Sequence, residues 1–240
     1  IASDDKELGF VLGSIHDTSS HLAMNQGWNL NTPQGQAVAK KYEDEVKDRN
    51  FITRSKYIIG IDIDGVIRAF IDRFAYIYEK EMGIKPLLPV TNENLIEHFP
   101  FPNGEKELES FIYDEFVLEI FAHAKEIRPN TMFYVNQLAD KIKNMGHELI
   151  LISKQFGKSK SATLFFLSKI ACQVDKIIFV QNSSDKWKHV DIMVDDSPKV
   201  LESKPKDKIS VKFEHGYNKE IESDFLISDV KQLLDDDFLN

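Results

Sequence analysis

Short apolar runs rich in β-branched residues alternate with longer amphipathic segments from about residue 55 onward. Apolar runs of about four to eight residues are typical of strands, and apolar positions three and four apart are typical of helices. This alternation predicts an α/β fold in which helices flank a parallel sheet. The expected strands are 56–62, 147–153, 176–180, 190–194 and 208–213, and two expected helices are 133–146 and 159–171.

A long segment, 63–146, separates the first two expected strands and exceeds what a simple crossover needs. Within it, residues 92–99 and 104–124 have helical apolar spacing, and the breaker-rich stretch PFPNG lies between them. We therefore expect a small helical cap inserted after the first strand. The expected organisation is an N-terminal extension of 1–54, a core of 55–67 and 129–240, and a cap of 68–128.

The N-terminal extension has little regular pattern. One helix is expected to begin after Thr32, with Thr32 as N-cap and Pro33 at the first helical position. Three residues there are of metal-ligand type, but no partner pair with ligand spacing follows, which favours a surface loop. They are His16, Asp17 and His21.

Composition limits the partners and the location of the protein. A chain of 240 residues with 42% hydrophobic content can bury a substantial core. The 30 basic and 39 acidic residues give a net charge of -9, which disfavours long nucleic acids and anionic membranes as partners. The chain has neither an apolar run of about 20 residues nor a signal-peptide layout, so we expect a cytoplasmic protein. Cys172 is the single cysteine and is expected to be a buried residue without a disulfide.

An acidic pair follows the first expected strand in the segment IGIDIDGVI. Asp62 and Asp64 are two residues apart, so both side chains lie on one face at the carboxyl edge of the sheet. Two carboxylates this close repel each other unless a cation lies between them, and Mg²⁺ prefers such hard oxygen ligands. Taken alone, the pair also fits a solvated loop or a helix N-cap. Gly65 allows the backbone to turn sharply after it.

Three further features favour a catalytic site. The segment VDIMVDDSP ends in Asp195 and Asp196, which supply more carboxylates, and HELILIS ends in Ser153, whose hydroxyl suits a phosphate oxygen. Lys186 precedes Asp195 and could neutralise the phosphate and the attacking carboxylate, with Lys188 as the competing candidate. Because ligands bind at the carboxyl ends of strands in open α/β sheets, these residues are expected to share one site.

The order of these motifs resembles the four-motif signature of the haloacid dehalogenase superfamily over about residues 56–235. The resemblance implies a Rossmann-like sheet with a cap, and a Mg²⁺-dependent phosphatase reaction through an aspartyl phosphate. It implies that Asp62 is the nucleophile and Asp64 the general acid and base. It also implies that Ser153 holds the phosphoryl group and that Lys186 screens charge. The implied metal ligands are Asp62, the main-chain carbonyl of Asp64, Asp195 and, in support, Asp196.

The opening DIDGVIRAF is similar to that of the pyrimidine 5′(3′)-deoxyribonucleotidases, in which the final aromatic residue lines the base pocket. By that similarity the substrate is a nucleoside monophosphate and Phe70 stacks on its base. The helical spacing of Phe70, Phe74 and Ile77 equally fits three core positions. The later loop KQFGKSKSA departs from that branch. Its Lys154 and Lys158 suit a phosphate or a second anionic group, or else a solvated helix start.

Other functions are compatible with parts of the same sequence pattern. The cap position suits small phosphorylated molecules, so a phosphatase for sugar phosphates or other metabolites is the nearest alternative. A polynucleotide-end phosphatase fits the net charge poorly, and a phospho-receiver or other binding module has its acidic residues in a different order. A dehalogenase needs no acid at Asp64. Phe99 and Phe101 are candidates for aromatic substrate contacts or for a hydrophobic hinge.

Overall fold

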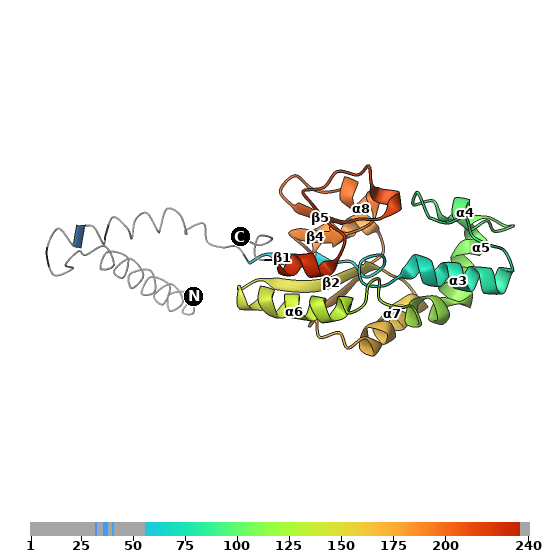
Figure 1. The fold of residues 1–240 in the computed structure, drawn as a ribbon, viewed down its shortest axis with the longest axis horizontal. Coiled ribbons are helices and arrows are strands. Elements are labelled where there is room, and N and C mark those ends of the chain that lie inside the picture. Colours follow the sequence, from blue (N-terminus) through green and yellow to red (C-terminus); the bar gives the residue numbers. More distant parts are fainter. Residues whose placement is uncertain (1–31, 33–35, 38–39, 41–55, 236–240) are drawn as a thin grey trace. The chain divides into compact units, whose positions relative to one another are not determined.

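The computed structural model describes residues 56–235 together with residues 32, 36, 37 and 40 (Figure 1). The chain divides into two units, 1–55 and 56–240. In the first unit the backbone N–H of Gln36 donates a hydrogen bond to the carbonyl of Thr32 at 3.0 Å, as expected for a helical turn that begins there.

Four residues considered from the sequence lie outside the described part of the chain. They are Pro33, His16, Asp17 and His21.

Six parallel strands form a single sheet in the order β3-β2-β1-β4-β5-β6. The α/β class expected from the sequence is confirmed, and so are the five expected strands. The sixth strand was not predicted, because it has only three residues and two of them are exposed. The strands are β1 (Ile58–Ile61), β2 (Glu148–Lys154), β3 (Ile177–Val180), β4 (Ile192–Asp195), β5 (Ile209–Phe213) and β6 (Phe225–Ile227).

Helices cover both faces of this sheet, as Figure 1 shows. The two long helices following the insert confirm the two helices expected from the sequence. The remaining elements of the core are short. They are η3 (Ser183–Lys188), α8 (Pro198–Glu202), η4 (Gly216–Asn218) and η5 (Val230–Leu234). The two long helices are α6 (Thr131–Asn144) and α7 (Lys158–Lys169).

Alternate strand residues enter two hydrophobic cores because strand side chains point to opposite faces in turn. Ile59 and Ile61 of β1 join the cluster that contains the buried residues of α6 and η5. Ile150 and Ile152 of β2 join a second cluster, which contains Trp187 of η3. With both faces buried, the strands read as nearly continuous apolar runs, as parallel strands do.

A helical insert follows β1 and has a hydrophobic cluster of its own, built around Phe74, Tyr78 and Phe111. Phe99 and Phe101 are buried in this cluster, and neither lines the cavity described below. Phe99 and Phe101 therefore have a packing role in the insert in place of the expected substrate contact. The insert consists of α3 (Phe70–Met82), α4 (Leu95–His98), α5 (Glu105–Ser110) and the π-helical turns η1 (Phe111–Glu115) and η2 (Leu118–Ala122).

The two ends of the insert meet where it joins the core. The N–H of Ala69 donates to the carbonyl of Lys125 at 2.9 Å, and the N–H of Ile127 donates to the carbonyl of Ile67 at 2.7 Å. Arg68 forms an antiparallel bridge with Glu126 between these bonds. The chain therefore leaves and re-enters the core at one short two-stranded junction.

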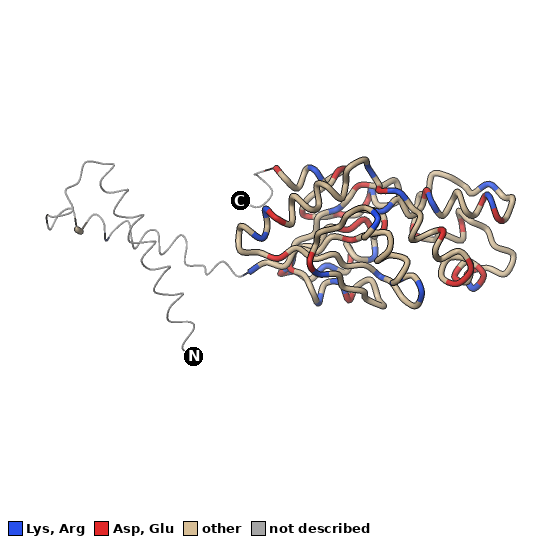
Figure 2. The backbone as a smooth tube through the Cα atoms, turned by 90° about the horizontal axis from the view of Figure 1, so that it is seen from below, with Lys and Arg blue, Asp and Glu red and all other residues tan. Residues whose placement is uncertain are grey.

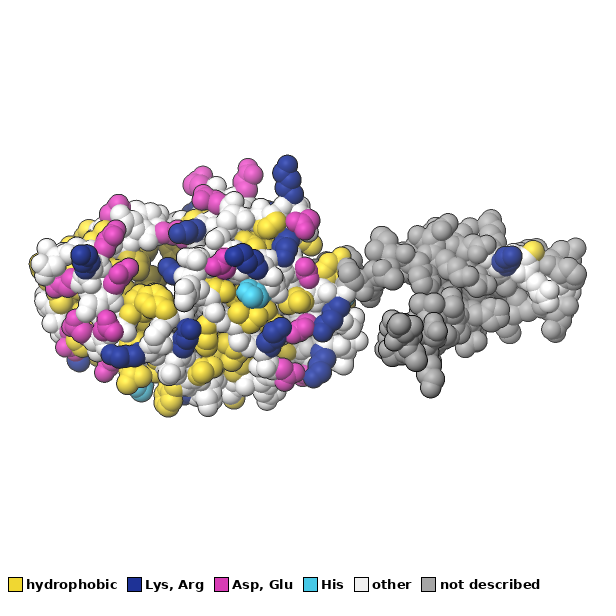
Figure 3. All heavy atoms as spheres, turned by 180° about the vertical axis from the view of Figure 1, so that it is seen from behind, with side chains coloured by type: hydrophobic (Ala, Val, Ile, Leu, Met, Phe, Trp, Pro, Cys, Tyr) yellow, Lys and Arg dark blue, Asp and Glu magenta, His cyan; other side chains and the backbone are white. Residues whose placement is uncertain are grey.

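Three features considered from the composition can be followed in the structure: the charge distribution, the apolar helices and the single cysteine. Basic and acidic residues are interspersed along the described backbone in Figure 2 and on the face seen in Figure 3. No helix among the described residues is long and apolar enough to cross a membrane. Cys172 is half-buried against the core rather than fully buried, because it lies just after the end of α7.

Candidate active site

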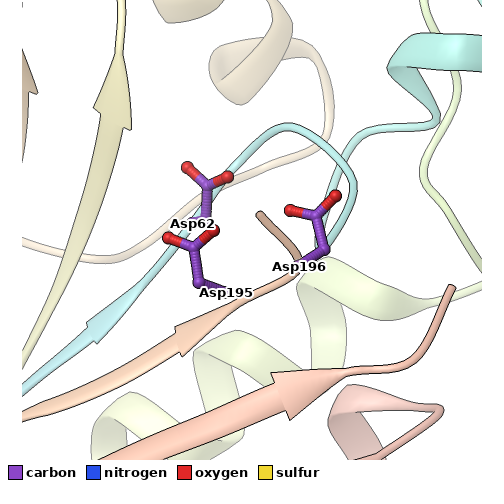
Figure 4. A group of neighbouring side chains, drawn as sticks. All are labelled: Asp62, Asp195 and Asp196. Atoms are coloured by element: carbon purple, nitrogen blue, oxygen red, sulfur yellow. The ribbon is translucent and has the colours of Figure 1, made fainter. Parts of the chain in front are cut away.

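The sequence-predicted carboxylates come together at the carboxyl ends of β1 and β4. These two strands are neighbours in the sheet, and the N–H of Asp62 continues their pairing by donating to the carbonyl of Val194 at 2.9 Å. The cluster consists of Asp62, Asp195 and Asp196, whose carboxylate oxygens approach within 4.8 Å of one another. Figure 4 shows the three side chains close together at the strand ends, with their carboxylates directed to the same side.

Burial makes this cluster electrostatically costly without a cation. Asp62, Asp195 and Asp196 are all buried, at most 7% exposed. Lys186 is buried with them, and its Nζ lies 2.7 Å from Oδ2 of Asp195 and 2.9 Å from Oδ1 of Asp62. The contact with Asp62 lacks hydrogen-bond geometry, so this Oδ1 accepts no hydrogen bond. One lysine balances one of three carboxylates, so the donor set fits a hard divalent cation such as Mg²⁺.

The same surroundings shift the pKa values of the cluster. Burial raises the pKa of Asp62 to about 7, opposed by the charge of Lys186 and reinforced by Asp195 and Asp64. Burial and the charge of Asp195 hold the pKa of Asp196 well above its usual range. For Lys186, burial lowers the pKa, but its two carboxylate partners outweigh burial and raise it overall. Lys186 is therefore charged at neutral pH, and the raised pKa values of Asp62 and Asp196 favour their protonated forms when no cation is bound.

Gly65 lets the loop after β1 pass close to the cluster. Its φ of 85° lies in the left-handed region, and a Cβ placed there would be 2.0 Å from Oδ2 of Asp196. Any side chain at this position would displace the Asp196 carboxylate. The glycine in the sequence DIDGV is therefore required by the carboxylate facing it.

Asp64 lies at the cavity wall, where three side chains hold its carboxylate. Arg68 binds it through two parallel bonds, from Nε to Oδ1 at 2.7 Å and from Nη2 to Oδ2 at 2.9 Å. Gln155 donates to Oδ2 at 2.6 Å, and the hydroxyl of Ser153 lies 3.4 Å from the same oxygen. The expected juxtaposition of Asp64 and Ser153 is present, whereas the roles of Arg68 and Gln155 were not foreseen.

The segment after β5 supports the cluster from another side. Tyr217 donates a hydrogen bond to Oδ2 of Asp196, and Asn218 donates to the main-chain carbonyl of Asp196 at 2.7 Å. Nε2 of His215 donates to the carbonyl of Gly65 at 2.7 Å, and its ring stacks on that of Tyr217. Burial lowers the pKa of His215, so the ring is neutral and can act as this donor.

A cavity of about 320 Å³ opens between the carboxylates and the insert. Its polar wall includes Asp62, Asp64, Ser153 and Lys186. Its apolar wall comes mostly from the insert and contains Phe70, Ile71, Val90, Leu95, Tyr113 and Phe121. A small molecule with an anionic end and an apolar or planar end fits such a cavity.

Of the remaining predicted residues, Phe70 and Lys154 line the cavity, and Lys158 and Lys188 do not. Phe70 lines the cavity while its ring also packs against Phe121 at a centroid distance of 5.5 Å, so it has a packing role, and its contact with a nucleobase stays a prediction. Lys154 is exposed and lines the cavity. Lys158 does not line it and instead lies 3.8 Å from Asp114. The competing lysine, Lys188, is exposed and pairs with Asp185 at 2.6 Å, away from the cluster.

Sequence reasoning missed Arg68, Gln155, His215 and Tyr217. Three of them carried a usable signal. His215 and Tyr217 follow β5, the strand after the one that ends in Asp195, so reading each strand end for polar residues would have found them. Gln155 directly follows β2 and carries the same signal, whereas Arg68 follows the buried Val66 and Ile67, and only its contacts identify it.

The sheet order and the helices on both faces define the Rossmann-like α/β fold of haloacid dehalogenase-like hydrolases. One such solved structure, a haloacid dehalogenase-like hydrolase from Bacteroides fragilis, is 15% identical with a TM-score of 0.53, covering 75% of this chain and 100% of that chain. A phosphonoacetaldehyde hydrolase-like protein from Oleispira antarctica is 14% identical with a TM-score of 0.50, covering 75% and 90%. These similarities establish the fold alone. No protein-family model matches the chain, and no curated protein matches its sequence.

Proposed function

We propose that this chain is a Mg²⁺-dependent phosphomonoester hydrolase that forms an aspartyl phosphate on Asp62. The observation that carries the proposal is the buried Lys186 bridging Asp62 and Asp195, with Asp196 beside them and Ser153 on the adjacent strand. A buried carboxylate beside a lysine, at the wall of a cavity, suits attack on an electrophile whose negative charge the lysine balances.

Asp62, Asp195, Asp196 and the main-chain carbonyl of Asp64 would hold the Mg²⁺ ion. All are hard oxygen donors, and the three carboxylates already lie within bridging distance of one another. When bound, the ion neutralises charge on the phosphoryl oxygens and on the attacking carboxylate.

Four side chains have separate parts in the proposed reaction: those of Asp62, Asp64, Lys186 and Ser153. An oxygen of Asp62 attacks phosphorus and forms the acyl phosphate, while the bond from phosphorus to the leaving oxygen breaks. Asp64 gives its proton to the leaving oxygen, and then accepts a proton from the water that attacks phosphorus and frees Asp62. Lys186 balances charge on the phosphoryl oxygens, and the hydroxyl of Ser153 donates to one of them.

The helical insert is proposed to act as a cap, with the bounds 68–128 expected from the sequence. It supplies the apolar wall of the cavity and also touches the core beside the cluster. There Ser197, the residue after Asp196, donates to Oε1 of Glu93 in the insert at 2.6 Å. A closed insert excludes water other than the attacking molecule, which protects an acyl phosphate from unproductive loss.

Within this class we propose a nucleoside monophosphate as substrate, which makes the chain a 5′-nucleotidase. Support comes from the aromatic wall of the cavity, where Phe70 and Tyr113 both pack against Phe121. A nucleobase can stack on such a wall while the phosphate reaches Asp62. Lys154 at the rim suits a second interaction with the anionic end of the substrate.

Phosphate release from a panel of nucleoside monophosphates and sugar phosphates tests the proposal. We expect turnover that requires Mg²⁺, is abolished by EDTA and by Asp62→Asn, and is fastest with a nucleotide. Turnover of sugar phosphates alone would replace the nucleotide with the metabolite alternative. Undiminished turnover by Asp62→Asn would refute the nucleophile and with it the mechanism.

A further inference from the structure

Arg68 is a fully buried arginine whose donors are directed to three parts of the chain. Besides its two bonds to Asp64, its Nη1 donates to the main-chain carbonyl of Phe121 at 2.9 Å. Nη1 and Nη2 both lie 3.1 Å from the hydroxyl of Thr163. A buried guanidinium is costly unless its charge and its donors are matched, and here both are.

The plane of the guanidinium is fixed as well as its charge. Its Cζ lies 4.9 Å from the ring centroid of Phe121 in η2 and 5.1 Å from that of Phe166 in α7. Cation–π contacts of this kind add to the hydrogen bonds in restricting the group. Arg68 therefore joins the loop after β1, the end of the insert and the helix that follows β2.

These contacts of Arg68 fix the orientation of the Asp64 carboxylate. Arg68 engages both of its carboxylate oxygens in the paired geometry that orients a carboxylate most strictly. Gln155 fixes Oδ2 from the end of the neighbouring parallel strand β2 at 2.6 Å. A partly exposed aspartate at a cavity wall otherwise samples several rotamers, so these contacts select the one in which it faces the cavity.

We propose that Arg68 is a positioning residue that sets the orientation of Asp64 and links it to the placement of the insert. The link is direct, since one guanidinium binds both the carboxylate of Asp64 and the carbonyl of Phe121 in the insert. The proposal rests on the proposed function, because it gives Asp64 the role of proton donor to the leaving oxygen.

The proposal predicts a dependence on the leaving group. An alkoxide needs a proton as its bond to phosphorus breaks, whereas p-nitrophenolate leaves without one. Misplacing Asp64 therefore slows phosphoryl transfer from an alkyl phosphate and spares transfer from p-nitrophenyl phosphate. A general structural defect slows both alike. The quantity to compare is kcat/KM, since it reports the steps up to the first irreversible one.

The experiment compares Arg68→Lys with the matched control Arg73→Lys in the full-length chain. Lysine keeps the charge but cannot form the paired bonds to a carboxylate. Arg73 also donates to a carbonyl of the same π-helical turn, that of Glu119 at 2.7 Å, but does not line the active-site cavity. Each variant is assayed with p-nitrophenyl phosphate and with the alkyl phosphate turned over fastest by the wild type, and Mg²⁺ binding is measured by calorimetry.

We expect kcat/KM of Arg68→Lys to fall on the order of 10²-fold for the alkyl phosphate and less than about 3-fold for p-nitrophenyl phosphate, with unchanged Mg²⁺ affinity. Arg73→Lys should match the wild type with both substrates. Thr163→Val is an isosteric change that removes one hydrogen-bond acceptor of Arg68. It should show the same selectivity between the two substrates with a smaller fall in kcat/KM, and it replaces Arg68→Lys if that variant does not fold. Equal losses with both substrates would overturn the role of Arg68 alone. Absence of Mg²⁺-dependent turnover in the wild type would overturn the proposed function and this role with it.

Discussion

The hydroxyl of Tyr217 donates a hydrogen bond to Oδ2 of Asp196 across the gap between two neighbouring strand ends. The bond fixes the carboxylate that closes the acidic cluster and favours its ionised form, opposing the burial that raises the pKa of Asp196. We predict that Tyr217→Phe weakens Mg²⁺ binding about 10-fold, the usual effect of losing a partner of a metal ligand. Isothermal titration calorimetry measures the affinity directly.

Tyr76→Phe is the matched control, because Tyr76 is exposed on α3 and does not line the active-site cavity. An unchanged affinity in Tyr217→Phe would mean that Asp196 is held well enough by its main-chain contact with Asn218.

Lys186 and Lys188 provide a second pair for comparison. Lys186→Met leaves Asp62 and Asp195 buried without a cation, so we expect the free energy of unfolding of the metal-free protein to fall by about 3 kcal/mol at neutral pH. Turnover should be lost, and Mg²⁺ should restore part of the stability. Lys188→Met removes only an exposed pair with Asp185 and should change stability by less than about 1 kcal/mol.

Urea unfolding with and without Mg²⁺ measures both lysine variants. Loss of turnover in Lys188→Met together with activity in Lys186→Met would reverse the assignment of the two lysines.

Gly65 should be the least replaceable glycine described here. In Gly65→Ala the new Cβ meets the Asp196 carboxylate at 2.0 Å while φ remains at 85°, so we expect loss of Mg²⁺ binding and of turnover. Gly83 also has a positive φ, 66°, but nothing lies within 4 Å of its Cβ position. Gly83→Ala should therefore cost only about 1 kcal/mol of backbone strain and leave turnover intact. Equal effects of the two substitutions on Mg²⁺ binding would contradict the contact between Gly65 and Asp196.

The pKa of Asp62 gives a prediction about pH. Burial raises this pKa to about 7 in the metal-free protein, so the folded state holds a proton that the unfolded state releases near its ordinary value of 3.8. A raised pKa stabilises the folded state below the unfolded value, and this stabilisation is lost as the pH rises to about 7. In EDTA, the wild type should therefore lose more stability between about pH 4 and pH 8 than Asp62→Asn does.

Mg²⁺ must displace this proton, so its stabilising effect should be larger at about pH 8 than at about pH 5.5. Urea unfolding at each pH measures both effects. A parallel pH dependence in the wild type and in Asp62→Asn would show that Asp62 ionises normally in the folded chain.

Much of the fold followed from the pattern of apolar residues. Strands such as β2 are buried on both faces, so their sequence is a nearly continuous apolar run. β6 was missed because Phe225 and Leu226 are exposed and only Ile227 is buried, so no run or alternation marks it. The region 104–124 was expected to be helical, but its end is two π-helical turns, which depend on packing within the insert rather than on a periodic pattern.

The candidate site was predictable where strand ends carry it. Asp62, Ser153 and Asp195 each stand at the end of a buried strand, so the topology of a parallel sheet brings them together before any side-chain detail is known. Arg68 was beyond such reasoning, because its position depends on which side chains fill the space beside Asp64. Those choices are made by tertiary contacts between distant segments, which no local pattern records.

The narrow junction at which the insert meets the core also bears on how such a protein can change over generations. Ala69 and Lys125 are hydrogen-bonded neighbours, so the two ends of the insert are held at a fixed span where it joins the core. The entropy of closing a loop grows slowly with its length, which leaves the insert free to lengthen, shorten or be exchanged at little cost to the sheet. Substrate preference could thus diverge quickly around an unchanged set of carboxylates, provided that each new insert again offers a carbonyl to Arg68.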